Sequence, residues 1–79
     1  MDNTTYEERL LIDIENTERE AEAYYNISTG FSVLASLPEV SSSERSNLLY
    51  QSEKYSRLNK ECKEFLDELL KLKRDRGIL

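Results

Sequence analysis

Few residues of this chain are of the types that carry catalysis or bind metals. The 79 residues include one cysteine, Cys62, and no histidine, so the usual general base for a thiol is missing and the common Cys/His zinc sites cannot form. The sixteen acidic residues show no distinguished acid–base pair, and no glycine-rich phosphate loop is present. We therefore expect no enzyme activity, no cofactor and no metal, and we interpret Cys62 as a packed thiol.

The charges divide unevenly along the chain. Residues 1–40 hold nine acids and two arginines, whereas residues 41–79 hold seven acids and nine bases, within a net charge of −5. An acidic balance disfavours non-specific binding to nucleic acid, which depends on neutralising phosphates with basic side chains. It favours pairing of the acidic first half with the basic second half.

The chain has no apolar run long enough to span a membrane, which takes ~20 residues. Its first residues, MDNTTYEERL, lack the basic and apolar regions of a signal peptide. We expect an intracellular, cytoplasmic protein that is not inserted in a membrane. A peripheral membrane helix is disfavoured, because its acidic polar faces would be repelled by anionic lipids.

The first half has the signals of one long helix at about residues 5–36. Thr4 with Glu7, or Thr5 with Glu8, has capping-box spacing, in which the hydroxyl and the carboxylate each bond a free backbone N–H of the first turn. Apolar or small residues then recur at alternating spacings of four and three, as one face of a helix requires. This stripe is Leu10, Ile14, Thr17, Ala21, Tyr24, Ser28, Phe31 and Ala35.

A turn at residues 37–42 is predicted to separate the first helix from a second one at about 42–76. Pro38 disfavours helical geometry at the residue before it, and Ser41 with Glu44 forms another capping-box pair. The serines at 41–43 fit simple turn and capping chemistry, with phosphorylation as the less economical alternative. Gly77 is expected to end the second helix in a left-handed conformation. The second stripe is Leu48, Gln51, Tyr55, Leu58, Cys62, Phe65, Leu69 and Leu72.

The two stripes match if the chain folds back on itself as a single all-α antiparallel helical hairpin. Facing residue numbers then sum to 79 throughout, from Phe31 with Leu48 to Leu10 with Leu69, and Ser28 meets Gln51 in a polar pair. The predicted seam is Leu10, Ile14, Ala21, Tyr24, Phe31, Leu48, Tyr55, Leu58, Cys62, Phe65, Leu69 and Leu72. The alternative is one continuous helix in a parallel coiled coil, which would keep a proline in mid-helix at a cost of ~3 kcal/mol.

The hairpin leaves apolar side chains outside its seam. Leu11, Leu66 and Leu70 lie to the same side of it and at nearly the same height, which predicts a leucine patch near the open end of the hairpin. Tyr25 and Tyr50 also point away from the seam and are candidate contacts with a partner. In the alternative interpretation the leucines only cover their own helices.

We therefore expect a non-enzymatic protein–protein interaction module. It would form a four-helix bundle with itself, or serve as a small coiled-coil subunit or adaptor of a tethering, trafficking or segregation assembly. The alternative is a small acidic regulator that binds a basic groove of a partner protein. Its binding face would be the acidic cluster Asp13, Glu15, Glu18, Glu20 and Glu22.

Overall fold

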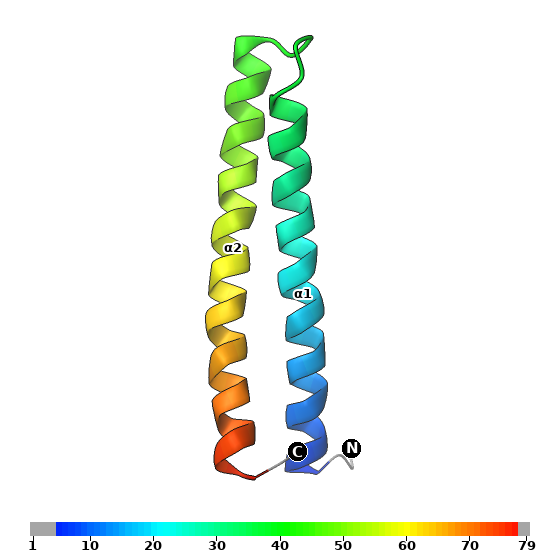
Figure 1. The fold of residues 1–79 in the computed structure, drawn as a ribbon, viewed down its shortest axis with the longest axis vertical. Helices are drawn as coiled ribbons and strands as arrows, with labels where there is room; N and C mark the ends of the chain where they lie inside the picture. The colour runs from blue at the N-terminus through cyan, green and yellow to red at the C-terminus, as the bar shows by residue number, and fades with distance from the viewer. Residues whose placement is uncertain (1–4, 78–79) are drawn as a thin grey trace.

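Two long α-helices joined by a short turn make up the protein. The computed structural model describes residues 5–77, with α1 at Tyr6–Ala35 and α2 at Ser42–Asp75. The helices lie side by side in opposite directions, so the start of α1 and the end of α2 share one end of a molecule measuring 52 × 26 × 15 Å (Figure 1). The predicted all-α antiparallel hairpin is confirmed, and the continuous-helix alternative is wrong because the chain reverses at residues 36–41.

Hydroxyl caps start both helices. Thr5 is the N-cap of α1 and accepts a hydrogen bond from the backbone N–H of Glu8, at 3.2 Å. The other predicted pair includes Thr4, which lies outside the described residues. Ser41 accepts from the N–H of Glu44, at 3.2 Å, and donates to the carboxylate of the same residue, at 3.1 Å. After α2, Gly77 has a φ of 68°, which is the left-handed conformation that glycine adopts without strain. The helix bounds lie within one residue of the predicted ranges.

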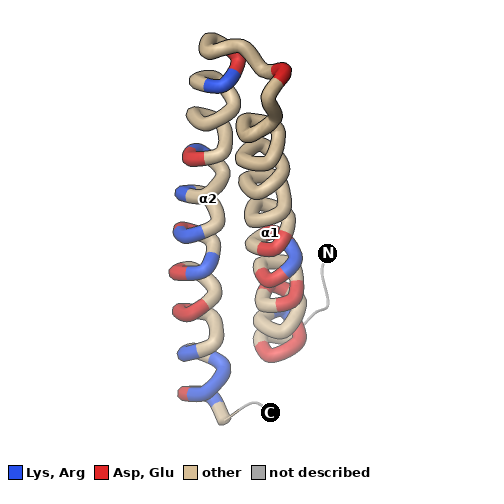
Figure 2. Tube along the Cα trace, turned by 45° about the horizontal axis from the view of Figure 1, so that its top comes forward, with Lys and Arg blue, Asp and Glu red and all other residues tan. Residues whose placement is uncertain are grey.

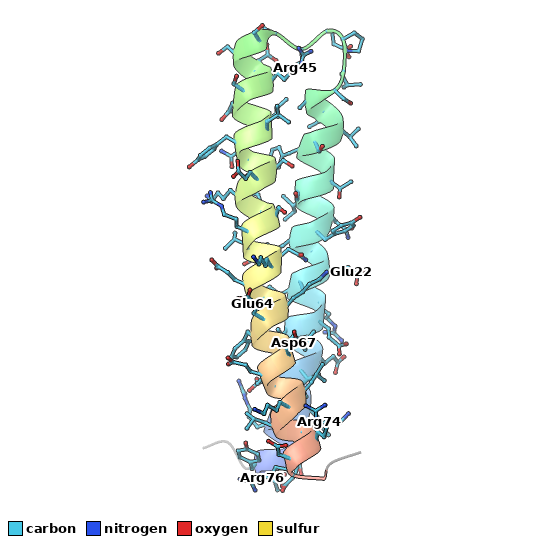
Figure 3. The ribbon with its side chains drawn as sticks, turned by 60° about the vertical axis from the view of Figure 1, so that its left-hand side comes forward. Glu22, Arg45, Glu64, Asp67, Arg74 and Arg76 are labelled. Carbon is cyan, nitrogen blue, oxygen red and sulfur yellow. The ribbon has the colours of Figure 1, made fainter. Side chains whose placement is uncertain are left out.

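An arginine that the sequence analysis did not single out holds the turn together. The Arg45 guanidinium donates to the carbonyl oxygens of Ala35 at 2.8 Å, and of Leu37 and Val40 at 3.3 Å each. The carbonyls at the end of a helix lack intrahelical partners, and a planar guanidinium with five N–H donors can satisfy several at once. Arg45 therefore joins the end of α1 to the start of α2, and Figure 3 shows it at the turn.

The core between the helices is thin. Its buried residues are mostly small or of medium size, and no large side chain of the described residues is fully buried. Leu10, Ile14 and Leu69 form a cluster near the open end, and Leu66 packs against it. The buried set is Leu10, Ile14, Thr17, Ala21, Ala35 and Leu69. Nearer the turn, the half-buried rings of Tyr24, Phe31 and Tyr55 are in contact, with centroids 6.1 and 5.9 Å apart.

Polar side chains of α2 reach the backbone of α1 along the seam. Asn59 donates to the carbonyl of Ala21 at 2.6 Å, and the Cys62 thiol lies 3.4 Å from the carbonyl of Thr17. The hydroxyls of Ser28 and Ser52 each donate to the other residue's carbonyl, at 2.8 and 2.9 Å. Small seam residues on α1 let the helices approach closely enough for these short side chains to reach across.

These bonds correct two details of the predicted seam. Ser28 pairs with Ser52, not with Gln51. Phe65 and Leu72 are 52% and 43% exposed, and Leu66 packs against the core where Phe65 was expected. Compared with the predicted seam, α2 is rotated about its own axis by about half of the ~100° that separates successive residues. This rotation turns Ser52 and Asn59 inward.

The remaining predicted seam residues, from Leu10 to Leu69, are buried or half-buried. The members of this set on α1 are Leu10, Ile14, Ala21, Tyr24 and Phe31, and those on α2 are Leu48, Tyr55, Leu58, Cys62 and Leu69.

Candidate protein-interaction surface

Two faces flank the seam of the hairpin. Leu11, Glu18 and Tyr25 each follow a seam residue of α1, and Leu49, Lys63 and Leu70 each follow a seam residue of α2. On antiparallel helices equal angular offsets point to the same side, so these six residues share one face, which we call the leucine face. The opposite face, which we call the phenylalanine face, carries Ile27, Leu34, Leu58, Phe65 and Leu72.

The predicted leucine patch lies at the open end of the leucine face. Leu11 and Leu70 are 39% and 38% exposed. Leu66 is half-buried, because it packs against the cluster of Leu10, Ile14 and Leu69. The patch is thus the place where the hydrophobic core reaches the surface. A partner that covered Leu11 and Leu70 would extend this core across the interface.

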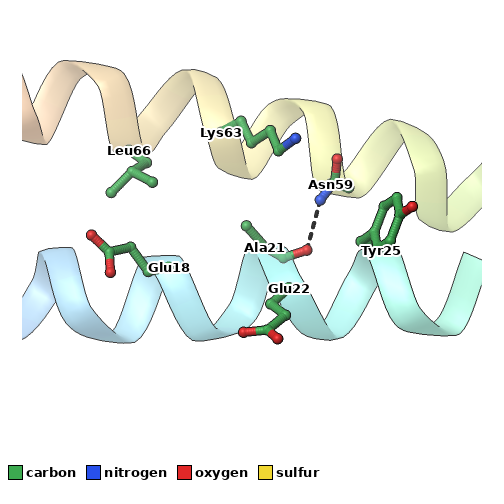
Figure 4. A pocket seen from close by; sticks show the side chains of 7 residues that line it. All are labelled: Glu18, Ala21, Glu22, Tyr25, Asn59, Lys63 and Leu66. Atoms are coloured by element: carbon green, nitrogen blue, oxygen red, sulfur yellow. Dashed lines mark hydrogen bonds between the residues drawn. The ribbon is translucent and has the colours of Figure 1, made fainter.

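An open hollow of about 360 Å³ lies beside the patch on the leucine face (Figure 4). Its floor is Ala21, whose small side chain and carbonyl leave room for the hydrogen bond from Asn59. Leu66 borders one end, Tyr25 the other, and Lys63 extends along α2 at the rim. The structure thus places Tyr25, itself 59% exposed, on the same face as the leucines. A hollow between two apolar borders is the shape that takes a side chain from a packed helix.

Tyr50, the fifth predicted contact residue, lies apart from the other four. It follows Leu49 by one residue, so it projects from the outer side of α2 and is as exposed as Tyr25. The structure therefore does not join Tyr50 to the leucine face. Its role as a partner contact stays a prediction that the fold does not connect with the leucine patch.

The phenylalanine face was missed as an apolar surface by the sequence analysis, which assigned Phe65 and Leu72 to the seam. Hollows of about 330 and 230 Å³ lie on it, the first beside Cys62 and Phe65 and the second beside Ile27 and Leu34. The sequence signal for it is the apolar arc of the second helix, about 160° wide at ~100° per residue, which exceeds what one seam covers. The hairpin therefore exposes apolar side chains on both sides.

Charges are not paired across the seam. Within residues 5–77 the ion pairs are Arg9 with Asp13 and Arg19 with Glu15, both inside α1. The expected pairing of the acidic and basic halves is thus not found inside this part of the chain. Figure 2 shows acidic residues crowding the part of α1 near the open end, mixed charges along α2, and an uncharged stretch of α1 toward the turn. The opposite charges of the two helices remain open to a partner.

Two titratable groups in or beside the seam have shifted pKa values. A hydrogen bond of 3.0 Å from the Tyr24 hydroxyl to Glu20, and the charge of that carboxylate, raise the pKa of Tyr24 above its ordinary value. Burial raises the pKa of the Cys62 thiol, because it disfavours the thiolate. A protonated thiol that donates to a carbonyl is a packing group, as expected for Cys62, and a poor nucleophile.

Within the described residues, no three His, Cys, Asp or Glu side chains come together as metal ligands. No helix in that range is long and apolar enough to cross a bilayer. Comparison of the chain with known protein families, with curated proteins and with solved structures finds no match. The fold and surface thus define a class, a two-helix hairpin with an apolar face on each side of its seam.

Proposed function

We propose that this protein is a non-enzymatic protein–protein interaction module that docks through its leucine face. The observation that supports this most is the contrast between core and surface. No large side chain is fully buried among the described residues, whereas Leu11, Tyr25 and Leu70 are exposed on one face beside a hollow. A chain of this size rarely buries enough apolar surface to be stable alone.

The energetic scale favours coupling of folding to association. Complete burial of a leucine contributes about 1.5 to 3 kcal/mol. Leu11 and Leu70 are 39% and 38% exposed, so covering what remains of them contributes about 1 to 2 kcal/mol. That gain matters for a short chain, because typical folded domains are separated from their unfolded chains by only about 5–15 kcal/mol. The partner would be a helical protein in the cytoplasm, either another copy or a subunit of a larger coiled-coil assembly.

Charge substitutions in the patch test this proposal. Leu11→Glu and Leu70→Glu should each abolish association, because each places a carboxylate where an apolar contact forms. Val33→Glu is the matched control, since Val33 is an exposed apolar residue of α1 that lies on neither face. Sedimentation velocity, with circular dichroism to compare helix content, measures the outcome. Association that survives both leucine substitutions would contradict the proposal.

A second candidate function is suggested by the acidic surface of α1. Of its seven acids, only Asp13 and Glu15 pair with an arginine, so the others could meet a basic groove on another protein. Reversing the charge of Glu20, which pairs with no arginine of the described residues and lines a hollow of the opposite face, separates the two functions. Under this second candidate the reversal abolishes binding to a basic partner. Under the first it leaves association through the leucine face unchanged.

A further inference from the structure

We propose that the occupant of the leucine face is a second copy of this chain, aligned in parallel so that α1 of each copy lies against α2 of the other. This inference rests on the proposed function and adds the identity and orientation of the partner. The product is a four-helix bundle in which every neighbouring pair of helices is antiparallel, an arrangement common in such bundles. The two copies are related by a two-fold axis parallel to the helices.

The charges of the two helices select this orientation. Helix α1 carries seven acids and two arginines, and α2 carries seven acids and eight bases. Among the described residues the hairpin uses none of this difference, because no ion pair joins α1 to α2. A second copy placed with α1 on α1 would oppose two strongly acidic helices, whereas α1 on α2 brings opposite net charges together.

The residues of the leucine face match in the proposed alignment. The bonds between the helices join residues whose numbers sum to 80, Ser28 with Ser52 and Ala21 with Asn59. Leu11 with Leu70, and Glu18 with Lys63, sum to 81, so each pair lies at the same height to within about 1.5 Å. A two-fold axis parallel to the helices preserves height, so Leu11 meets Leu70 of the second copy and Glu18 meets Lys63 of the second copy. The same rule places Tyr25 opposite Ser56, a large side chain opposite a small one. At the open end an apolar residue thus meets an apolar residue, and beside it opposite charges meet.

Shape and area also fit a second copy. In this alignment the hollows above Ala21 of the two copies face each other, and the long side chains at their rims, Tyr25 and Lys63, are placed to fill the joint space. A specific dimer buries about 800 Å² on each partner. The broad side of the molecule, 52 by 26 Å, offers enough surface for that.

Mixing two charge variants tests the contact between copies. Glu18→Lys alone and Lys63→Glu alone each oppose like charges twice per dimer, so each should weaken self-association about tenfold at low salt. In a mixture of the two variants, both contacts between copies become attractive again, although each chain keeps its own internal repulsion. Förster transfer between a donor-labelled Glu18→Lys chain and an acceptor-labelled Lys63→Glu chain should therefore recover to within about threefold of wild-type affinity.

Lys54→Glu is the matched control, because Lys54 is exposed and nine residues from Lys63, which places it on the opposite side of α2. It should leave dimerisation unchanged. Mixed variants that stay as weak as each alone overturn the Glu18–Lys63 contact, and single variants that strengthen association indicate the α1-on-α1 orientation instead. If Leu70→Glu disrupts the dimer but neither charge variant does, the proposed alignment is wrong and the leucine face remains the contact surface.

The mass and helix content of the wild-type chain show whether the second copy as partner is wrong, or the proposed function as well. A wild-type monomer that is poorly helical at all concentrations overturns the second copy as partner and leaves the interaction module standing. A stable, fully helical monomer overturns both.

Discussion

The amide of Asn59 donates a hydrogen bond of 2.6 Å to the carbonyl of Ala21 on the opposite helix. Together with Ser52 and Cys62, it places polar side chains where a simple hydrophobic seam would place apolar ones. A partly buried donor that loses its acceptor pays the desolvation cost without compensation. These three residues thus fix the rotation of α2 about its own axis.

Replacing the Asn59 amide with a carboxylate should destabilise the hairpin. In Asn59→Asp, a negatively charged acceptor faces the Ala21 carbonyl, so we expect a loss of about 1 to 3 kcal/mol in the free energy of unfolding. Urea denaturation followed by circular dichroism measures it. Asn16→Asp is the control, because Asn16 is exposed on α1 and should cost little. Equal stabilities of the two variants would show that the Asn59 bond does not hold the helices.

The thiol of Cys62 should react slowly in the folded protein. Its pKa is raised above 9.0 by burial, so the thiolate is scarcer than in the unfolded chain and alkylation at pH 8 should be slower without urea than with it. The folded state holds the thiol proton more tightly than the unfolded chain does. The stability that this difference contributes is therefore present below pH 9.0 and is lost as pH rises through the pKa of Cys62 in the folded state. Tyr24, with a pKa raised above 10.0, acts in the same direction.

Urea titrations should therefore give similar stabilities at pH 7 and 9 and a decrease at pH 10.5. Cys62→Ala should reduce that decrease. A stability that rises with pH across this range would contradict the raised pKa values of Cys62 and Tyr24.

Periodicity predicts the residues of α1 better than those of α2. The stripe of α1 from Leu10 to Ala35 has apolar neighbours such as Leu11, yet all of its predicted residues are buried or half-buried in the structure. On α2, Phe65 and Leu66 are adjacent apolar residues, and apolar spacing cannot choose between them. The choice is made by polar bonds of Ser52 and Asn59, which a hydrophobic pattern assigns to the outside.

At the scale of the elements, the turn is stabilised by contacts from both helices. Pro38 and the capping box at Ser41 predict where the chain reverses, because both act on the local backbone. The three bonds from Arg45 to carbonyls at and after the end of α1 were not predictable, since they depend on how close the two helix ends lie. They join the elements at the end of the molecule that lies far from the core cluster of Leu10, Ile14 and Leu69.

Loss of the guanidinium should loosen this end of the hairpin. A lysine at position 45 carries the same charge but cannot reach three carbonyls at once, so we expect Arg45→Lys to cost about 1 to 3 kcal/mol. Hydrogen exchange should show the loss first in residues 34–48. Arg57→Lys, at an exposed position of α2, is the control and should change neither quantity. Unchanged exchange near the turn in Arg45→Lys would mean that the caps alone hold it.

At the scale of the whole molecule, the hairpin is a layer only one helix thick. Its shortest dimension is 15 Å, and each helix can bury one side against the other while its flanks stay exposed. The apolar residues of those flanks, on the leucine face and on the phenylalanine face, are therefore the natural place for further helices. The two-helix fold is a folding unit whose stability is expected to depend on association.

If this chain is built to associate, its mass in solution rises with its concentration. Sedimentation equilibrium and circular dichroism should be measured on the same dilution series. We expect a helical species of twice the 9.3 kDa chain mass at high concentration, with helix lost as the mass falls on dilution. A 9.3 kDa monomer that stays fully helical at every concentration would contradict it.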